Sequence, residues 1–210
     1  MSPSAASFAG KRLLIFDLDG TLVDSSPIHA RAFADMFAPL GLQVDYDQIA
    51  GMTTAAAVER LLADAGRDLP AEEREALVSG KQQRSRALIE RELRPIEGAA
   101  EFVGAARRRF ACALCTSASP ISAQAALAAT GLAGWFDPVI TAADVRHGKP
   151  HPEGFLLAAE RAGFAPAQAL VFEDSASGLA AAAAAGMDAI AIGPGGSDWP
   201  ALSAMLATSA

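Results

Sequence analysis

Residues 13–22 read Leu-Leu-Ile-Phe-Asp-Leu-Asp-Gly-Thr-Leu, an apolar run that is followed at once by two alternating carboxylates and a glycine. An uninterrupted apolar run is typical of a parallel strand that is covered on both faces. Gly20 gives the chain the freedom to turn sharply after this strand. Asp17 and Asp19 therefore stand where a strand ends and a loop begins, so one can act as a nucleophile or metal ligand and the other as a proton donor. The alternative interpretation is an Asx turn that only ends the strand.

Four further short apolar runs follow, and longer helical patterns alternate with them. The predicted strands cover residues 111–115, 138–141, 169–172 and 189–192. The predicted helices that accompany them cover residues 99–109, 119–130, 152–162 and 175–185. This alternation predicts βαβ units and hence an α/β fold, with a Rossmann-like, doubly wound parallel sheet that has helices on both faces.

The interval between the first two predicted strands is too long for one crossover helix. Nearly a hundred residues separate Phe16 from Phe110, whereas a crossover needs roughly a dozen or more. Helical patterns occupy this interval near residues 27–40, 54–65 and 71–93. We therefore expect residues 26–94 to form an inserted all-helical lobe, and residues 1–25 and 95–210 to form the α/β core.

Charge and composition argue against some classes of function. The net charge is −7, which argues against a nucleic-acid groove and against binding to an anionic membrane surface. The sequence shows neither the charged start and apolar run of a signal peptide nor an apolar stretch of about 18 residues. We expect a cytoplasmic, soluble monomer that binds neither nucleic acid nor membrane.

Polar side chains follow several of the predicted strands. Asp17, Thr116 and the pair Glu173-Asp174 each come at the carboxyl end of an apolar run. In a doubly wound sheet these ends meet at one edge, where ligands bind. Clustered carboxylates repel one another unless a cation compensates. The sequence therefore predicts a site in which a divalent metal and Lys149, from the loop of residues 146–152, offset the acidic charges. A helix-capping role for Glu173-Asp174 is compatible with this site.

These motifs, in this order and spacing, resemble the haloacid dehalogenase-like (HAD) phosphotransferases. The motifs are Asp17-Leu-Asp-Gly-Thr, Thr116-Ser117, Lys149-Pro150 and Glu173-Asp174-Ser175, and together they extend over essentially the whole chain. The helical insert after the first motif resembles the C1-type cap of that family. The resemblance is to the branch that contains small-molecule phosphatases and β-phosphoglucomutase, and it implies the HAD fold and an enzyme.

The resemblance also implies roles for individual residues. Asp17 would attack phosphorus and become an aspartyl phosphate, and Asp19 would act as general acid and then as general base. Thr116 would hold phosphoryl oxygens, and Lys149 would neutralise charge beside Asp17. The implied cofactor is Mg²⁺, and its ligands would be Asp17, the backbone carbonyl of Asp19 and Asp174, with Glu173 binding it directly or through water. The implied substrate-binding residues are Gly20, Thr21, His29, Lys81, Ser117 and Ala118.

Phosphatases and mutases of this branch share the core, so the cap has to distinguish them. β-Phosphoglucomutases carry a cap-loop arginine, but residues 51–55 read Gly-Met-Thr-Thr-Ala, with Thr54 at the matching position. Pro120 also stands where the mutases place polar phosphate contacts. These differences favour hydrolysis of a small phosphate monoester of a sugar or polyol. A β-phosphoglucomutase-like mutase is the alternative. A non-enzymatic aspartyl-phosphate acceptor is a third hypothesis, and the large insert argues against it.

Two further pairs invite a metal or redox interpretation. Cys112 and Cys115 fall in a predicted strand at a spacing that sends their side chains to opposite faces, which predicts buried thiols and no zinc site. His147 and His151 are four residues apart, but a glycine and a proline between them preclude a helix. We therefore expect no zinc site at these two histidines. His29 is interpreted either as a capping or surface histidine or as a site residue.

Overall fold

The computed structural model describes residues 8–49, 52–196 and 198–208. The chain divides into two compact units. One unit comprises the chain up to Asp24 together with the chain from Arg94 onward, and the other comprises Ser25–Leu93. These bounds lie within one residue of the predicted ones. The role of the second unit as a cap stays a prediction.

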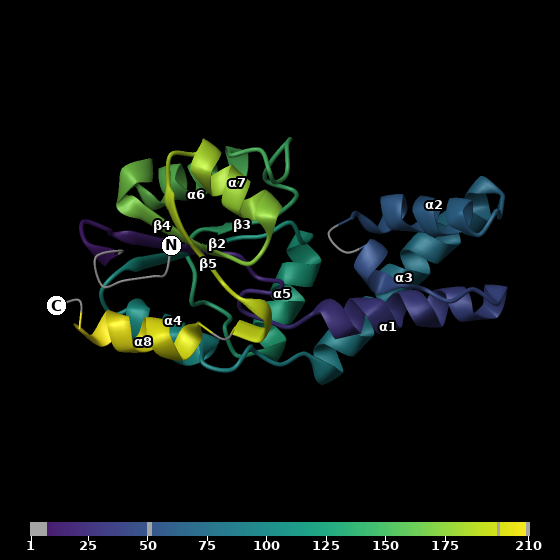
Figure 1. Cartoon of the computed structure of the whole chain (residues 1–210), viewed down its shortest axis with the longest axis horizontal. Helices are drawn as coiled ribbons and strands as arrows, with labels where there is room; N and C mark the ends of the chain where they lie inside the picture. Colours follow the sequence, from purple (N-terminus) through teal and green to yellow (C-terminus); the bar gives the residue numbers. More distant parts are fainter. Residues whose placement is uncertain (1–7, 50–51, 197, 209–210) are drawn as a thin grey trace. The chain divides into compact units, whose positions relative to one another are not determined.

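The first unit is built on a parallel five-stranded sheet with the strand order β3-β2-β1-β4-β5 (Figure 1). The strands are β1 (Leu13–Phe16), β2 (Ala111–Cys115), β3 (Val139–Ile140), β4 (Ala169–Glu173) and β5 (Asp188–Ala191). Phe16 lies opposite Leu114 on one side and Phe172 on the other, so the carboxyl ends of the three central strands are level. The predicted doubly wound α/β fold is confirmed.

Helices cover both faces of the sheet. Helices α6 (Glu153–Ala162) and α7 (Ala176–Ala184) lie on one face, and α4 (Ala99–Ala106) and α8 (Trp199–Thr208) lie on the other (Figure 1). Helix α5 (Pro120–Ala129) connects β2 to β3. The core under α6 and α7 contains many alanines, among them Ala158 and Ala159 of α6 and Ala181 and Ala182 of α7, all fully or almost fully buried. Small side chains let these helices approach the sheet closely.

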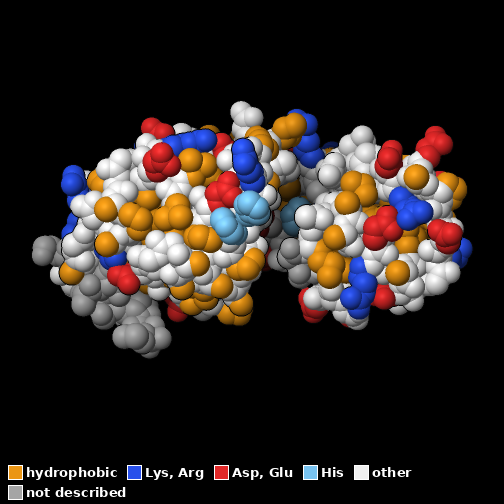
Figure 2. Space-filling model, turned by 90° about the horizontal axis from the view of Figure 1, so that it is seen from above, with side chains coloured by type: hydrophobic (Ala, Val, Ile, Leu, Met, Phe, Trp, Pro, Cys, Tyr) orange, Lys and Arg blue, Asp and Glu red, His pale blue; other side chains and the backbone are white. Residues whose placement is uncertain are grey.

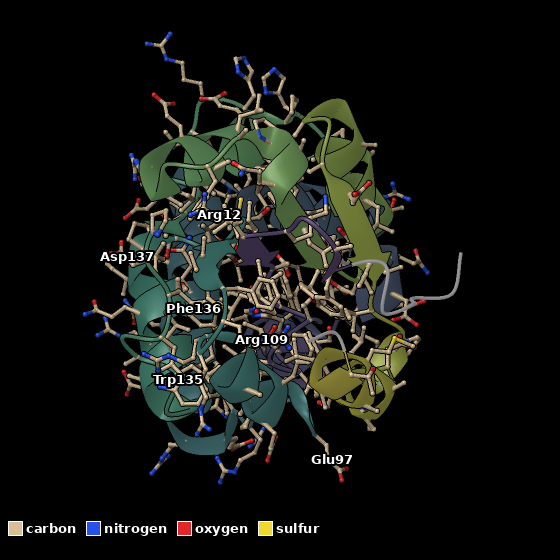
Figure 3. All side chains as sticks on the ribbon, turned by 90° about the vertical axis from the view of Figure 1, so that its left-hand side faces the viewer. Arg12, Glu97, Arg109, Trp135, Phe136 and Asp137 are labelled. Atoms are coloured by element: carbon tan, nitrogen blue, oxygen red, sulfur yellow. The ribbon has the colours of Figure 1, made fainter. Side chains whose placement is uncertain are left out.

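The opposite face of the sheet holds an aromatic core between the strands, α4 and α8 (Figure 3). The rings of Phe16 and Phe172 stack with centroids 4.8 Å apart, and Phe102 and Trp199 pack against them. Trp199 also donates a hydrogen bond from Nε1 to the carbonyl oxygen of Thr21, at 3.1 Å. Helix α8 thereby supports the loop that follows β1. The sequence patterns did not predict α8.

Three details of the first unit correct or refine the predictions. The last strand is not covered on both faces: β5 lies at the sheet edge, where Asp188, Ala189 and Ala191 are exposed and only Ile190 is buried. The predicted helix over residues 99–109 ends at Ala106, where three consecutive arginines begin. The prediction that the two cysteines are buried thiols is confirmed, since both are free and buried, and burial raises the pKa of each to about 12.

The second unit consists of α1 (Ser26–Phe37), α2 (Thr54–Asp64) and α3 (Ala71–Glu92), with 3₁₀ turns at Ala38–Leu40 and Tyr46–Gln48. It has its own apolar core, which includes Phe33, Phe37, Val58 and Leu62. Thr53 caps α2, because its side chain accepts a hydrogen bond from the backbone N–H of Ala56. Gly51, the first residue of the loop compared with the mutases, lies outside the described residues.

Within the described part of the chain, no helix is both long enough and apolar enough to cross a membrane.

Candidate active site

The loop after β1 places Asp17 at the carboxyl edge of the sheet. The backbone N–H of Asp17 continues the ladder by donating to the carbonyl of Phe172, at 3.0 Å. The chain then turns tightly, with Gly20 at φ +85° and its N–H donating to the carbonyl of Val23, at 2.8 Å. Asp17 is consequently only 6% exposed, whereas Asp19 is half-buried.

Lys149 joins three neighbouring strands at this edge. Its Nζ donates to Asp17 Oδ1 at 2.6 Å, to Glu173 Oε2 at 2.7 Å and to the carbonyl oxygen of Cys115 at 3.1 Å. These partners belong to the ends of β1, β4 and β2, respectively. The structure thus brings together Asp17, Lys149 and Glu173, which lie far apart in the sequence.

Asp174 belongs to the same cluster. Asp17, Glu173 and Asp174 each place one carboxylate oxygen within 4.8 Å of the other two. Thr21 Oγ1 donates to Asp174 Oδ1, at 3.2 Å. A Cβ atom at Gly20 would overlap the Asp174 carboxylate, so this close approach requires glycine there.

Burial and the neighbouring charges shift the pKa values of the residues in this cluster. Burial raises the pKa of Asp17 well above its ordinary value; the negative charges of Glu173 and Asp19 add to this, and Lys149 opposes it. Burial, reinforced by Glu173, also raises the pKa of Asp174. Burial by itself would lower the pKa of Lys149, but the charges of Asp17 and Glu173 outweigh it and raise that pKa. Lys149 is therefore protonated at neutral pH, and further positive charge would favour the ionised carboxylates.

The donor set fits a hard divalent cation. Three carboxylate side chains that approach one another this closely offer the oxygen ligands that Mg²⁺ prefers. Burial raises the pKa values of Asp17 and Asp174, and the charge of Glu173 raises both further, so a bound cation would favour their ionised forms. These residues could therefore hold a metal ion beside the buried Asp17.

Glu173 is fixed by contacts to both of its oxygens. Oε1 accepts hydrogen bonds from the N–H and the Oγ of Ser175, at 3.1 and 2.7 Å, while Oε2 contacts Lys149. Ser175 in turn caps α7, because its Oγ accepts from the N–H of Gly178, at 3.0 Å. The helix cap considered for Glu173-Asp174 in the sequence is thus provided by Ser175, and this leaves the two carboxylates to the cluster.

Thr116 continues β2 at the same edge. Its N–H donates to the carbonyl of Ile140 at 2.9 Å, and its Oγ1 accepts from the N–H of Ala118 at 3.0 Å. Leu114 of β2 pairs with Phe16 of β1, the last residue before Asp17. Thr116, two residues after Leu114, therefore lies on the strand next to the start of the Asp17 loop. Thr116 is buried, Ala118 is half-buried and Ser117 is exposed, so the segment presents polar groups at the sheet edge.

A model of the haloacid dehalogenase-like hydrolases matches residues 11–186 of this chain. The chain belongs to that family. The predicted resemblance and the prediction of an enzyme are confirmed, and the acidic cluster of this hydrolase lies where the family motifs had been placed in the sequence.

Several relatives of this hydrolase are phosphatases. Fructose-1-phosphate phosphatase YqaB of Escherichia coli is 36% identical, over 84% of this chain and 94% of that protein. The phosphorylated carbohydrates phosphatase of Thermotoga maritima is 31% identical, over 84% and 82% of the two chains. Among solved structures, CbbY from Rhodobacter sphaeroides in complex with phosphate superposes with a TM-score of 0.77 at 28% identity, over 87% and 86% of the two chains.

The two site residues predicted in the second unit of the hydrolase contact each other. Lys81 Nζ donates to His29 Nδ1 at 3.3 Å and lies 4.6 Å from the centre of the Phe33 ring. Ser85 Oγ is 3.4 Å from the same nitrogen of His29. Lys81 is buried, with only 6% exposure. The sequence did not predict this contact, because the residues belong to α1 and α3. Their role toward a substrate stays a prediction.

The absence of a zinc site at His147 and His151 stays a prediction, although the lack of a helix between them does not keep them apart. The segment between them is not helical, as expected, yet it brings both imidazoles to the carboxylate of Glu153. A loop can bring side chains together without helical spacing, so a glycine and a proline between two ligands do not exclude a site.

Proposed function

We propose that this hydrolase is a Mg²⁺-dependent phosphatase that cleaves a small phosphate monoester of a sugar or polyol through an aspartyl phosphate on Asp17. The observation that carries the proposal is the contact of buried Asp17 with Lys149 at 2.6 Å, within a cluster of three carboxylates. The names of the relatives support the class of substrate, since YqaB is named for fructose 1-phosphate and a second relative is named hexitol phosphatase B.

The proposed reaction has two displacements at phosphorus. In the first, a carboxylate oxygen of Asp17 forms a bond to phosphorus while the bond to the ester oxygen breaks, and Asp19 gives its proton to the departing alkoxide. In the second, a water molecule gives a proton to Asp19 and bonds to phosphorus, and the bond to Asp17 breaks to release phosphate. Asp19 thus regains its proton, and the side chain of Asp17 returns as a carboxylate.

The other residues orient the reacting groups and balance their charges. Lys149 holds Asp17 in place by its bond to Oδ1 and counters the charge of the approaching phosphate. The Thr116 hydroxyl and the backbone N–H groups that follow it, together with Gly20 and Thr21, would hold phosphoryl oxygens. Mg²⁺ would be held by Asp17, Glu173, Asp174 and the carbonyl of Asp19. When bound, it supplies the positive charge that an anionic nucleophile needs beside an anionic ester.

We assign the unit Ser25–Leu93 as the cap of this hydrolase. The support is its helical content, its separate apolar core and its place in the chain directly after the first motif. His29 and Lys81 are its proposed substrate-binding residues. A cap of this kind limits substrates to the size of small metabolites and excludes water, so phosphoproteins are not expected as substrates.

A phosphate-release screen tests the proposal and includes the removal of metal. We expect sugar and polyol monophosphates, with fructose 1-phosphate and a hexitol phosphate in the panel, to give the highest kcat/KM. Activity should be lost in EDTA and restored by Mg²⁺. Conversion of β-glucose 1-phosphate to glucose 6-phosphate without release of phosphate would instead show a mutase. A lasting phosphoprotein after incubation with acetyl phosphate would show an acceptor protein.

Gly178 offers a test of the position of Glu173. A Cβ atom at Gly178 would overlap the Glu173 carboxyl group, which is buried and bonded to Lys149 and Ser175. We expect Gly178→Ala to displace this carboxylate and to lower kcat/KM by about 10²-fold, the usual cost of moving a catalytic group by about 1 Å. Alanine has a higher helix propensity than glycine, so a loss of activity in this variant would not come from a weaker helix.

Gly104→Ala is the matched control for this substitution. Gly104 also lies in a helix of the first unit, and its Cβ would make an ordinary contact 3.6 Å from the Trp135 ring. Kinetics on the best substrate from the screen measure both variants. Equal kcat/KM values for Gly178→Ala and Gly104→Ala would contradict the assigned role of the Glu173 carboxylate.

A further inference from the structure

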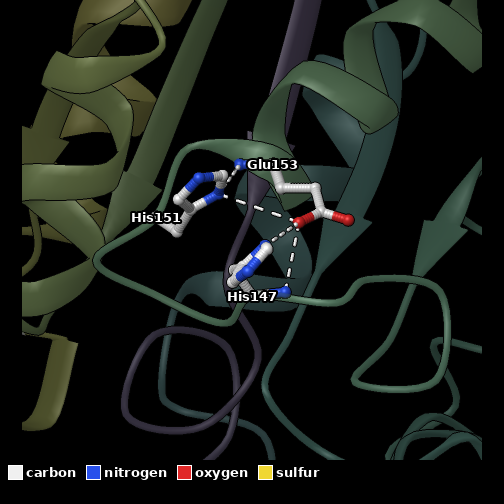
Figure 4. A group of neighbouring side chains, drawn as sticks. All are labelled: His147, His151 and Glu153. Carbon is white, nitrogen blue, oxygen red and sulfur yellow. Dashed lines mark hydrogen bonds and ion pairs between the residues drawn. The ribbon is translucent and has the colours of Figure 1, made fainter.

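The loop that carries Lys149 also gathers two histidines and a glutamate on its outer side. His147, His151 and Glu153 face one another (Figure 4), and imidazole side chains lie together on the surface of the first unit (Figure 2). His147 Nδ1 is 3.0 Å from Glu153 Oε2, and His151 Nδ1 is 3.8 Å from the same oxygen. The centroids of the two rings are 4.7 Å apart. One potential ligand atom from each of the three residues thus lies within 4.8 Å of the other two.

The backbone of the loop holds this arrangement. The Glu153 carboxylate accepts from the N–H of Arg146 at 2.9 Å and from the N–H of His147 at 3.1 Å. The N–H of Glu153 donates to His151 Nδ1 at 3.3 Å, and the N–H of His151 donates to the carbonyl of Gly148 at 3.0 Å. The loop backbone therefore orients the carboxylate without a metal.

We propose that His147, His151 and Glu153 form a binding site for a late first-row divalent metal such as Zn²⁺. Two imidazoles and one carboxylate are a common ligand set for this ion, with water completing the coordination. At the usual zinc–ligand bond lengths, neighbouring ligands of a tetrahedral ion are about 3.3 Å apart. The two measured distances to Glu153 Oε2, 3.0 and 3.8 Å, lie on either side of that value. The side chains of His147 and His151 are 64% and 51% exposed, so an ion can reach them from solvent.

The proposed site differs in chemistry from the carboxylate cluster around Asp17. Imidazole nitrogens favour Zn²⁺, Ni²⁺ and Cu²⁺, whereas Mg²⁺ prefers oxygen ligands and keeps several waters. Mg²⁺ therefore should not compete for it. The two histidines flank the short segment with Lys149 at its centre, so a bound ion would tie together both sides of that segment. The inference does not depend on the proposed phosphatase activity.

Calorimetric titration of the full chain with Zn²⁺, in excess Mg²⁺ to occupy the carboxylate cluster, tests the site. We expect one Zn²⁺ per chain, and at least about tenfold weaker binding in His147→Ala, in His151→Ala and in the double variant. Zn²⁺ at a hundredfold excess over Kd should raise Tm by about 5–10 °C in the wild type and by much less in the double variant. Circular dichroism would show that the exposed substitutions leave the fold intact.

Two matched variants locate the ion. Glu153→Gln should weaken Zn²⁺ binding, whereas Glu160→Gln, an exposed change on the same helix, should not. The proposal is overturned if the wild type shows no saturable binding up to millimolar Zn²⁺, or if the double histidine variant binds Zn²⁺ as tightly as the wild type. It is equally overturned if binding survives in the double variant and is lost in Asp174→Asn, because the ion would then occupy the carboxylate cluster.

Discussion

Asp17→Asn is expected to lower kcat for phosphate release by about 10⁴-fold or more, the scale of loss when a covalent nucleophile is removed. The asparagine side chain has nearly the same shape, so substrate and Mg²⁺ can still reach the site. Its amide cannot form the acyl-phosphate bond, however. Rapid-quench experiments on the wild type should also trap phosphate on Asp17, and the variant should trap none. The structural reason is the position of Asp17, which is buried at the sheet edge, 2.6 Å from Lys149.

Asp68→Asn is the control for this change. The Asp68 side chain is 99% exposed and lies in the second unit, so the same loss of charge there should leave kcat unchanged. Both variants should keep the circular dichroism of the wild type. If Asp17→Asn retained more than about a hundredth of wild-type kcat, another group would have to be the nucleophile, because general acid–base or electrostatic roles alone cost about 10²–10⁴-fold.

The part of the site that the sequence predicted consists of residues at strand ends. Asp17, Thr116, Glu173 and Asp174 follow apolar runs directly, and parallel strands bring such positions to one edge whatever the details of packing. Lys149 was singled out by its loop motif. Its three contacts could not be predicted, because they depend on the path of a loop that no periodic pattern describes.

The features that the sequence did not predict depend on contacts between distant elements. Helix α8 has little contrast between an apolar and a polar face, and its position follows from Trp199 packing into the aromatic core and bonding to Thr21. The exposure of β5 reflects its place at the sheet edge, which apolar content alone cannot reveal. The convergence of His147 and His151 on Glu153 required hydrogen bonds between loop backbone and side chain.

Lys149→Met is expected to lower kcat/KM by about 10²–10³-fold, the usual cost of losing one preorganised charge-stabilising group. Methionine fills similar space but cannot donate to Asp17, Glu173 or the carbonyl of Cys115. The variant should also depend differently on pH. Lys149 lowers the pKa of Asp17 against the effect of burial, so its removal raises that pKa further. The ionised fraction of Asp17 at a given pH is then smaller than in the wild type. The rise of activity with pH should therefore lie at higher pH in the variant than in the wild type.

Two further lysine variants separate this effect from a general loss of charge. Lys11 forms an ion pair with Asp188 at 2.6 Å and donates to the carbonyl of Ala167, at the opposite end of the strands from Asp17. Lys11→Met should keep the activity and pH profile of the wild type. Lys149→Arg should not restore activity, because a planar, longer guanidinium cannot replace an ammonium that donates to three oxygens at 2.6, 2.7 and 3.1 Å. Near-normal activity in Lys149→Arg, or an unshifted pH profile in Lys149→Met, would mean that Lys149 does not control the ionisation of Asp17 through these short contacts.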